Sequence, residues 1–351
     1  MVSAAITGAA HSLPSSMDQT QIWEGFFSEH YSGSPVARRI FASAGVKTRH
    51  GAVNPLDEDV SDWSTGARMA RYPAEAMPLG KEAVAGALAD AGLEAGDVGL
   101  FALASCTGYV TPGVDIRLAR DLGMADGVQR LVVGHMGCYA ALPGLGAVTD
   151  FVQARSRPAV LLCLELTSLH VQPASRDVGQ IVAHALFSDA ASAIVVEPGA
   201  TPGLEVVDVI ALTDASTADH MTWDVTDLGF RMGLSPRVPD VLAEHVCGVV
   251  DDLLGRNGLT RTDVEGWAVH PGGPRILDVV GERLGLPEDA LEISRATLRD
   301  HGNCSSATVL LVLDELRRTR PPRPGGHVVM MAFGPGLTLY AALLRATTDG
   351  A

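Results

Sequence analysis

One cysteine in this chain stands where a thiol can become a nucleophile. Cys138 follows an apolar, strand-like run that ends near residues 134–137, and it opens an alanine-rich, helix-like run. A thiol at a helix N-terminus meets the positive end of the helix dipole and unpaired N–H groups, which favour the thiolate. The same N–H groups can hold a tetrahedral oxyanion. The alternative is a buried structural thiol, which is what most free cysteines are.

A histidine suited to act as a base lies far along the chain from this cysteine. His270 ends an apolar run at residues 266–269 and precedes the turn Pro271-Gly272-Gly273. Strand ends in α/β folds face the ligand crevice, which is where a general base is expected. A structural histidine is the alternative. His135 is a rival base three residues before Cys138, but it lies on the strand side.

An asparagine and two serines precede the last amphipathic run. Asn303 stands directly before this run, with Ser305 and Ser306 in its first turn. These residue types often cap helix N-termini, and capping alone would explain them. In the functional interpretation, the Asn303 amide donates a hydrogen bond to a developing negative charge.

The composition is that of a globular protein and excludes several functional classes. The chain has 351 residues, 26 Lys plus Arg against 41 Asp plus Glu, and a net charge of -15, with no basic stripe for nucleic acid. The N-terminus lacks the features of a signal peptide, and no apolar run is long enough to span a bilayer. The five cysteines form no CxxC pair, which argues against a zinc site and a disulfide framework and favours a reducing cytoplasm. They are Cys106, Cys138, Cys163, Cys247 and Cys304.

Strand-like and helix-like runs alternate, which indicates a layered α/β fold. Strands are predicted at residues 98–106, 131–136, 159–166, 191–196, 204–211, 266–269, 327–333 and 338–344. Helices are predicted at residues 79–91, 114–122, 139–154, 238–254, 275–284 and 305–318. The turn-rich stretch at 197–203 is a plausible seam between two halves.

Taken together, these motifs resemble those of the type III polyketide synthases, the chalcone-synthase-like group. The resemblance rests on the strings GCYAALPG, HPGGPRILD, GNCSSA and AFGPGLTLYAALLR, and it extends from near residue 47 to the last strand. It implies a thiolase-like fold with layers in the order αβαβα, built from two similar halves. Residues 1–200 would carry the nucleophilic cysteine, and residues 201–351 the catalytic His270 and Asn303.

The resemblance also implies a reaction. Cys138 would take an acyl group from an acyl-CoA starter, and His270 and Asn303 would stabilise the enolate that forms when malonyl-CoA loses CO₂. Repeated extension and cyclisation would give a pyrone, a resorcinol or a related aromatic polyketide. The family pattern implies a homodimer, and no metal or other cofactor. Some strings, such as ALFSDAASA, resemble bacterial acyl-pyrone and acyl-resorcinol synthases, whereas SCTGY and SRATL resemble tetrahydroxynaphthalene synthases.

The residues that match the family's cavity positions include two departures. Phe187 matches an aromatic gatekeeper, but Met232 stands where a second gatekeeper is usually phenylalanine. Trp223 takes a position that is glycine in plant chalcone synthases. Other residues that match pocket positions are Thr167, His170, Ser305 and, in bacterial relatives, Cys106.

Three basic residues are candidates to bind the CoA phosphates, because they stand out in an acidic chain. They are Arg39, Lys47 and Arg49. Thr111 takes the place of a methionine that crosses the dimer interface in plant enzymes.

Two other functions remain open at this stage. A 3-oxoacyl synthase III-like enzyme also uses Cys, His and Asn, but its histidine is usually followed by a Gln-Ala-Asn run rather than Pro-Gly-Gly. The second is a catalytically idle thiolase-fold protein that binds acyl-CoA without turnover.

Overall fold

The protein is built around one continuous mixed sheet. The computed structural model describes residues 2–199 and 202–347. Nine strands pair in the order β11-β12-β13-β8-β1-β7-β6-β4-β5. Their bounds are β1 (Ala4–Ser12), β4 (Leu100–Ser105), β5 (Gln129–Gly134), β6 (Ala159–Glu165), β7 (Ala190–Pro198), β8 (Leu204–Thr213), β11 (Val264–Val269), β12 (His327–Gly334) and β13 (Thr338–Ala346).

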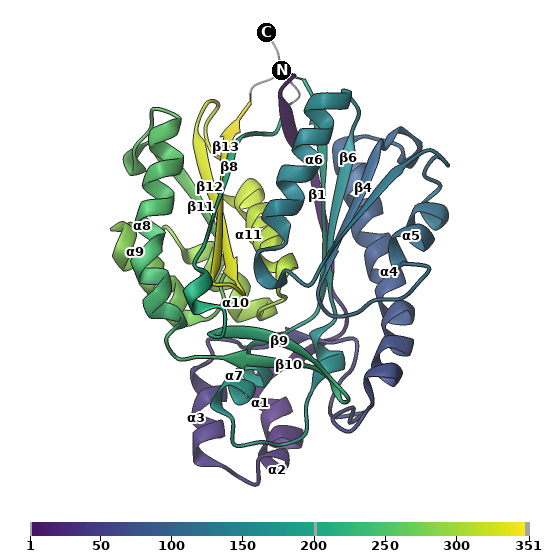
Figure 1. Cartoon of the computed structure of the whole chain (residues 1–351), viewed down its shortest axis with the longest axis vertical. Helices are drawn as coiled ribbons and strands as arrows, with labels where there is room; N and C mark the ends of the chain where they lie inside the picture. The colour runs from purple at the N-terminus through teal and green to yellow at the C-terminus, as the bar shows by residue number, and fades with distance from the viewer. Residues whose placement is uncertain (1, 200–201, 348–351) are drawn as a thin grey trace.

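The sheet forms two layers with helices between and outside them. β1 joins the layers, because it pairs with β7 along most of its length and with β8 only near Ala5 and Ile6. Helices α6 (Ala141–Arg155) and α11 (Ser306–Thr319) lie between the two layers, as Figure 1 shows. The outer faces are covered by α4 (Thr65–Ala91) and α5 (Val114–Leu122) on one side, and by α8 (Val238–Arg256) and α9 (Pro274–Leu284) on the other. The layer order is therefore αβαβα, as expected.

Separate apolar cores hold these layers together. The side chains of α6 and α11 pack with strands of both halves in the largest core. A second core lies under α4 and α5, and a third under α8 and α9. Central strands such as β6 and β12 are buried almost throughout, which explains their continuous apolar sequences.

A smaller assembly covers one end of the layers, at the bottom of Figure 1. It has its own aromatic core around Phe27 and Phe41. Its helices are α1 (Gln19–Ile22), α2 (Ser28–His30), α3 (Pro35–Ser43) and α7 (Val178–Leu186), with α10 (Glu292–His301) nearby; its strands are β2 (Ser16–Asp18), β3 (Thr48–His50), β9 (Met221–Thr226) and β10 (Gly229–Leu234).

The eight predicted strands and six predicted helices are all present, with shifted ends. The predicted helix at residues 79–91 is the second half of α4, which runs through Pro73 and Pro78. The alanine-rich β1 was missed, because Ile6 and Thr7 are the only β-branched residues among its nine and it has no Phe, Tyr or Trp.

The proposed division at residues 200/201 lies outside the described residues. Within residues 2–199 and 202–347, none of the helices is both long and apolar enough to cross a lipid bilayer.

Candidate active site

Cys138 lies in a tight turn between β5 and α6. It belongs to a 3-10 turn, Gly137–Tyr139, and the cap of α6 is Ala140, so the thiol stands just before the helix rather than in its first turn. Gly137 has φ of +73°, and a Cβ there would lie 2.8 Å from Cδ of Pro335. Only glycine fits this approach without strain. The turn thus fixes Cys138 in an interior position, 7% exposed.

Burial sets the protonation state of this thiol. Desolvation raises the pKa of Cys138 to about 12, the nearby Glu165 also raises it, and a hydrogen bond with Ser305 lowers it. Burial therefore opposes the thiolate that the position before a helix favours, because desolvation outweighs the stabilisation expected from the helix N-terminus. Burial thus favours the neutral thiol when no substrate is bound.

His270 directly follows β11, and its side chain lies in the same interior region as Cys138. Its backbone N–H donates to the Met331 carbonyl at 2.9 Å, which extends the pairing of β11 with β12 by one residue. The side chain is fully buried, and neither ring nitrogen has a hydrogen-bond partner among the residues that the structure describes. Burial lowers the pKa of His270 to about 3, so the ring is neutral and free to bond a substrate. The rival base His135 is exposed on the surface.

Asn303 is held by backbone pairing with the segment that precedes β7. Its N–H donates to Leu186 O, and its carbonyl accepts from Ser188 N–H, each at 2.9 Å. Its side-chain Oδ1 accepts the Ser305 N–H at 2.9 Å. No side-chain capping bond forms at the start of α11, so the capping interpretation of these residues does not hold. With Oδ1 occupied, the NH₂ end of the amide is the group left for a ligand.

A tunnel brings the three residues together. Cys138, His270 and Asn303 all line one cavity of about 540 Å³, as do Phe187 and Met232. The other lining residues are mostly apolar and come from α7, β10 and the start of α9, with Arg275 among them. Apolar walls of this kind limit the access of water to an acyl-enzyme.

A small inner chamber of about 20 Å³ continues from Cys138 on the far side of this tunnel. Besides Cys138, it is lined by six residues predicted from the sequence: Cys106, Thr167, Phe187, Trp223, Met232 and Ser305. The indole N–H of Trp223 donates to the Cys106 carbonyl at 2.7 Å, which fixes the ring as a wall of the chamber.

The chain matches two family models that together span most of its length. Residues 54–202 match the N-terminal domain of chalcone and stilbene synthases, and residues 210–348 match their C-terminal domain. The chain belongs to the chalcone and stilbene synthase family. As a type III polyketide synthase, it is an acyltransferase.

Relatives and solved structures agree with this family. The 1,3,6,8-tetrahydroxynaphthalene synthase of Streptomyces peucetius subsp. caesius is 36% identical over 336 residues, covering 93% of this chain and 88% of that protein. The alpha-pyrone synthesis polyketide synthase-like Pks18 of Mycobacterium tuberculosis is 32% identical, with 87% and 81% covered. The crystal structure of 1,3,6,8-tetrahydroxynaphthalene synthase from Streptomyces coelicolor A3(2) superposes with a TM-score of 0.93 at 28% identity, covering 98% of this chain and 100% of that one.

Within this chalcone-synthase-like site, Ser305 connects two thiols. Its φ of +49° is unusual for a residue with a side chain, and its hydroxyl lies 3.5 Å from the Cys106 sulfur while also bonding Cys138. The Cys106 sulfur lies 3.4 Å from a Glu165 carboxylate oxygen, and burial raises the pKa of Cys106. Ser305 therefore orients both sulfur atoms.

Glu165 was missed by the sequence analysis. It is fully buried at the end of β6 and accepts hydrogen bonds from Cys106, Thr107 and Ser306. Desolvation raises the pKa of this carboxyl, while the hydrogen bonds lower it. The available signal was a single glutamate inside an otherwise apolar run.

His170 lies apart from the inner chamber. Its Nε2–H donates to the Thr107 carbonyl at 2.6 Å, and its Nδ1 accepts the Phe230 N–H at 3.0 Å. Burial is the largest cause that lowers the pKa of His170 to about 3. Its ring faces a separate pocket behind Trp223, so the expectation that it lines the pocket beside Cys138 needs correction.

The basic residues predicted to meet CoA do not line the tunnel. Arg39 on α3 and Lys47 are exposed, so their contact with CoA phosphates stays a prediction. Arg49 is 6% exposed and donates to the carbonyls of His184 at 2.5 Å and Phe187 at 3.2 Å. Because the guanidinium is buried and already donates to backbone carbonyls, the structure gives no support to the predicted contact of Arg49 with CoA phosphates.

Proposed function

We propose that this enzyme condenses malonyl-CoA onto an acyl-CoA starter held on Cys138, and that His270 and Asn303 are its other catalytic residues. The observation that carries the proposal is the single tunnel into which all three side chains open. Relatives named for tetrahydroxynaphthalene and α-pyrone synthesis support cyclic products of this class.

The loading of the starter begins with both Cys138 and His270 in their neutral forms. The Cys138 proton passes to His270 as the sulfur attacks the starter thioester, since burial disfavours both the thiolate and the imidazolium when no substrate is bound. The C–S bond to CoA then breaks, and the CoA sulfur takes the proton from His270. The acyl group remains on Cys138, and His270 is neutral again.

In the extension step, His270 and Asn303 stabilise the negative charge of an enolate. Malonyl-CoA loses CO₂ and leaves a thioester enolate, whose oxygen accepts hydrogen bonds from the free NH₂ of Asn303 and the N–H of His270. The enolate carbon attacks the acyl carbonyl, a carbon–carbon bond forms, and the C–S bond to Cys138 breaks. The thiolate so formed persists only until it attacks the thioester of the extended chain, which Cys138 then carries. Since decarboxylation supplies the carbanion, we propose that the two CoA esters are the only small molecules required.

We also propose that the enzyme is a cytoplasmic homodimer. β5 lies at one end of the sheet order and carries exposed apolar side chains, with Val132 56% and Leu131 37% exposed. Tyr109 and Ile116 are exposed nearby in sequence. An edge strand with such side chains is stabilised by pairing with a second copy. All five cysteines are free, which suits a reducing compartment.

Intact-protein mass spectrometry tests the proposed function. Incubation with an acyl-CoA should add one acyl group to the wild-type protein and none to Cys138→Ala, which keeps the fold because the change is small. Addition of malonyl-CoA should then release cyclic products. A wild-type protein that binds acyl-CoA without becoming acylated would be the catalytically idle alternative and would overturn the proposal.

A further inference from the structure

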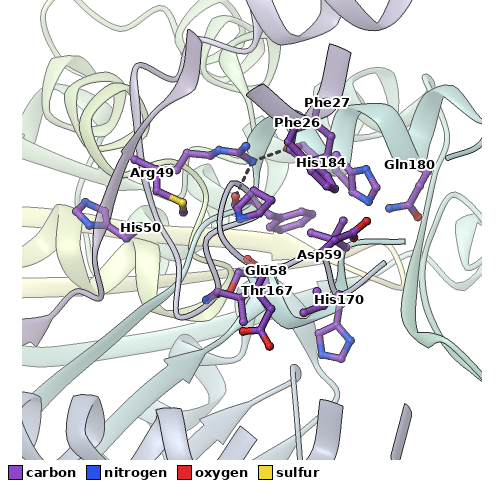
Figure 2. Close-up of a pocket in the computed structure, with 18 of the residues that line it drawn as sticks. Phe26, Phe27, Arg49, His50, Glu58, Asp59, Thr167, His170, Gln180 and His184 are labelled. Atoms are coloured by element: carbon purple, nitrogen blue, oxygen red, sulfur yellow. Dashed lines mark hydrogen bonds between the residues drawn. The ribbon is translucent and has the colours of Figure 1, made fainter. Parts of the chain in front are cut away.

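A second cavity lies behind the wall of the inner chamber, and the mechanism above does not use it. We call it the rear chamber. It measures about 50 Å³ and is lined by Phe26, Phe27, Val53, Val60, Gln180 and His184, among others. Figure 2 shows it between the N-terminal helices and α7.

The wall between the two chambers is one side chain thick. Thr167, Phe187 and Trp223 line both of them. The Trp223 ring is fixed by its hydrogen bond to the Cys106 carbonyl. The half-buried Phe187 side chain has no polar atom to hold its ring, which contacts the Trp223 ring at a centroid distance of 6.4 Å. Phe187 also lines the tunnel, so its ring stands at the junction of all three cavities. A rotation of this ring would join the inner and rear chambers.

The inner chamber is too small for an extended chain. Its volume of about 20 Å³ is close to the space that one water molecule needs. A chain lengthened on Cys138 must therefore pass beyond the wall or turn back into the tunnel. The rear chamber is the adjoining space that shares this wall.

Two side chains that line the rear chamber each carry a buried polar atom without a hydrogen-bond partner in the described part of the chain. Gln180 is 3% exposed, and its Oε1 has no hydrogen bond among the described residues; the same holds for Nε of Arg49, which is 6% exposed. Figure 2 shows these two side chains on opposite sides of the chamber. Leaving such groups unpaired is costly, so they point to a ligand with oxygen atoms.

The two unpaired atoms require a ligand that carries both a hydrogen-bond donor and an acceptor. Oε1 of Gln180 requires a donor, such as a hydroxyl, and the Arg49 N–H requires an acceptor, such as a carbonyl or hydroxyl oxygen. An enolised β-diketone carries both groups, and so does a hydroxylated chain or ring. A plain alkyl end would leave both atoms unpaired among aromatic walls.

We propose that the rear chamber receives the far end of the chain carried by Cys138 and selects ends that bear a hydroxyl or enol group over plain alkyl ends. This inference rests on the proposed acylation of Cys138. It makes Gln180 and Arg49 specificity-determining residues, with no part in bond making.

Matched starters test this selection without any extension step. Straight-chain acyl-CoAs from butanoyl to decanoyl are compared with their terminally hydroxylated counterparts, and the rate of acylation of Cys138 is followed by mass spectrometry. The wild type should favour the hydroxylated partner at the chain lengths that reach the chamber. Gln180→Met keeps a similar volume but no acceptor of comparable strength, so the preference should fall about tenfold.

Gln19 provides the matched control. It is buried, and its Oε1 is also unpaired, but it donates to the Ala185 carbonyl at 2.9 Å and does not line the rear chamber. Gln19→Met should leave the preference unchanged. An unchanged preference in Gln180→Met, an equal fall in both variants, or no preference in the wild type would overturn the inference while leaving acylation intact. Failure of every starter to acylate the wild type would instead overturn the proposed function.

Discussion

Mild acid should destabilise this protein, because several of its histidines are buried in the neutral form. Burial lowers the pKa of His170 and His270 to about 3 each, and burial together with the nearby His50 lowers that of His301 to about 4. In the unfolded chain, histidine has a pKa of about 6.5. Between these values the unfolded state binds more protons than the folded state, so stability falls as pH falls below about 6.5.

The size of the loss follows from these pKa values. At pH 5.5 each unfolded histidine holds about 0.9 proton, whereas the folded ones hold almost none. Each group therefore removes about 1.4 kcal/mol between pH 7.5 and 5.5, and the three together remove about 4 kcal/mol. His184, whose pKa is also lowered, adds to this loss. Burial raises the pKa of Glu165, which takes up its proton first in the folded state and so opposes the loss.

Urea unfolding at half-unit steps from pH 7.5 to 5.5, at one protein concentration, measures this effect. His270→Gln should reduce the loss by about 1.4 kcal/mol, because one titrating group is gone. His135→Gln is the control for the substitution itself, since that side chain is exposed. A wild-type loss below about 1 kcal/mol, or equal losses in wild type and His270→Gln, would refute the reasoning.

Three further outcomes are expected. Asn303→Ala and Asn303→Asp should both acylate Cys138, but the activation free energy of malonyl-CoA decarboxylation, measured as CO₂ release, should rise by about 3 kcal/mol. Asn303→Asp keeps Oδ1 for the Ser305 N–H, so an equal loss of acylation in this variant would make the residue structural. Trp223→Gly should merge the inner and rear chambers and shift products or accepted starters to longer chains, seen by mass; a destabilised protein with unchanged products would reject this role. Val132→Arg should convert dimers to monomers in analytical ultracentrifugation, because it places a charge on the exposed face of β5, and an unaltered dimer would move the interface elsewhere.

The sequence by itself determined the family, the layered fold and the three residues at the tunnel. The layered fold rests on local information, the apolar runs with a defined period, whereas the family and the joint role of the three residues rest on the resemblance of four motifs to the chalcone-synthase-like group. Cys138, His270 and Asn303 stand at the end of a strand or before a helix, and strand ends gather on one side of an α/β layer. The local patterns left a structural role open for each residue, and the family resemblance predicted that the three side chains meet, as they do in the tunnel.

The tertiary structure alone decided the protonation of the site and the shape of its cavities. Trp223 bonds the carbonyl of Cys106, 117 residues away in sequence, and Arg49 bonds the carbonyl of Phe187, 138 residues away. Desolvation likewise depends on everything that surrounds a group, which is why burial favours the neutral thiol of Cys138 despite its position just before a helix. Such effects arise from contacts between distant segments, and no pattern within a single segment encodes them.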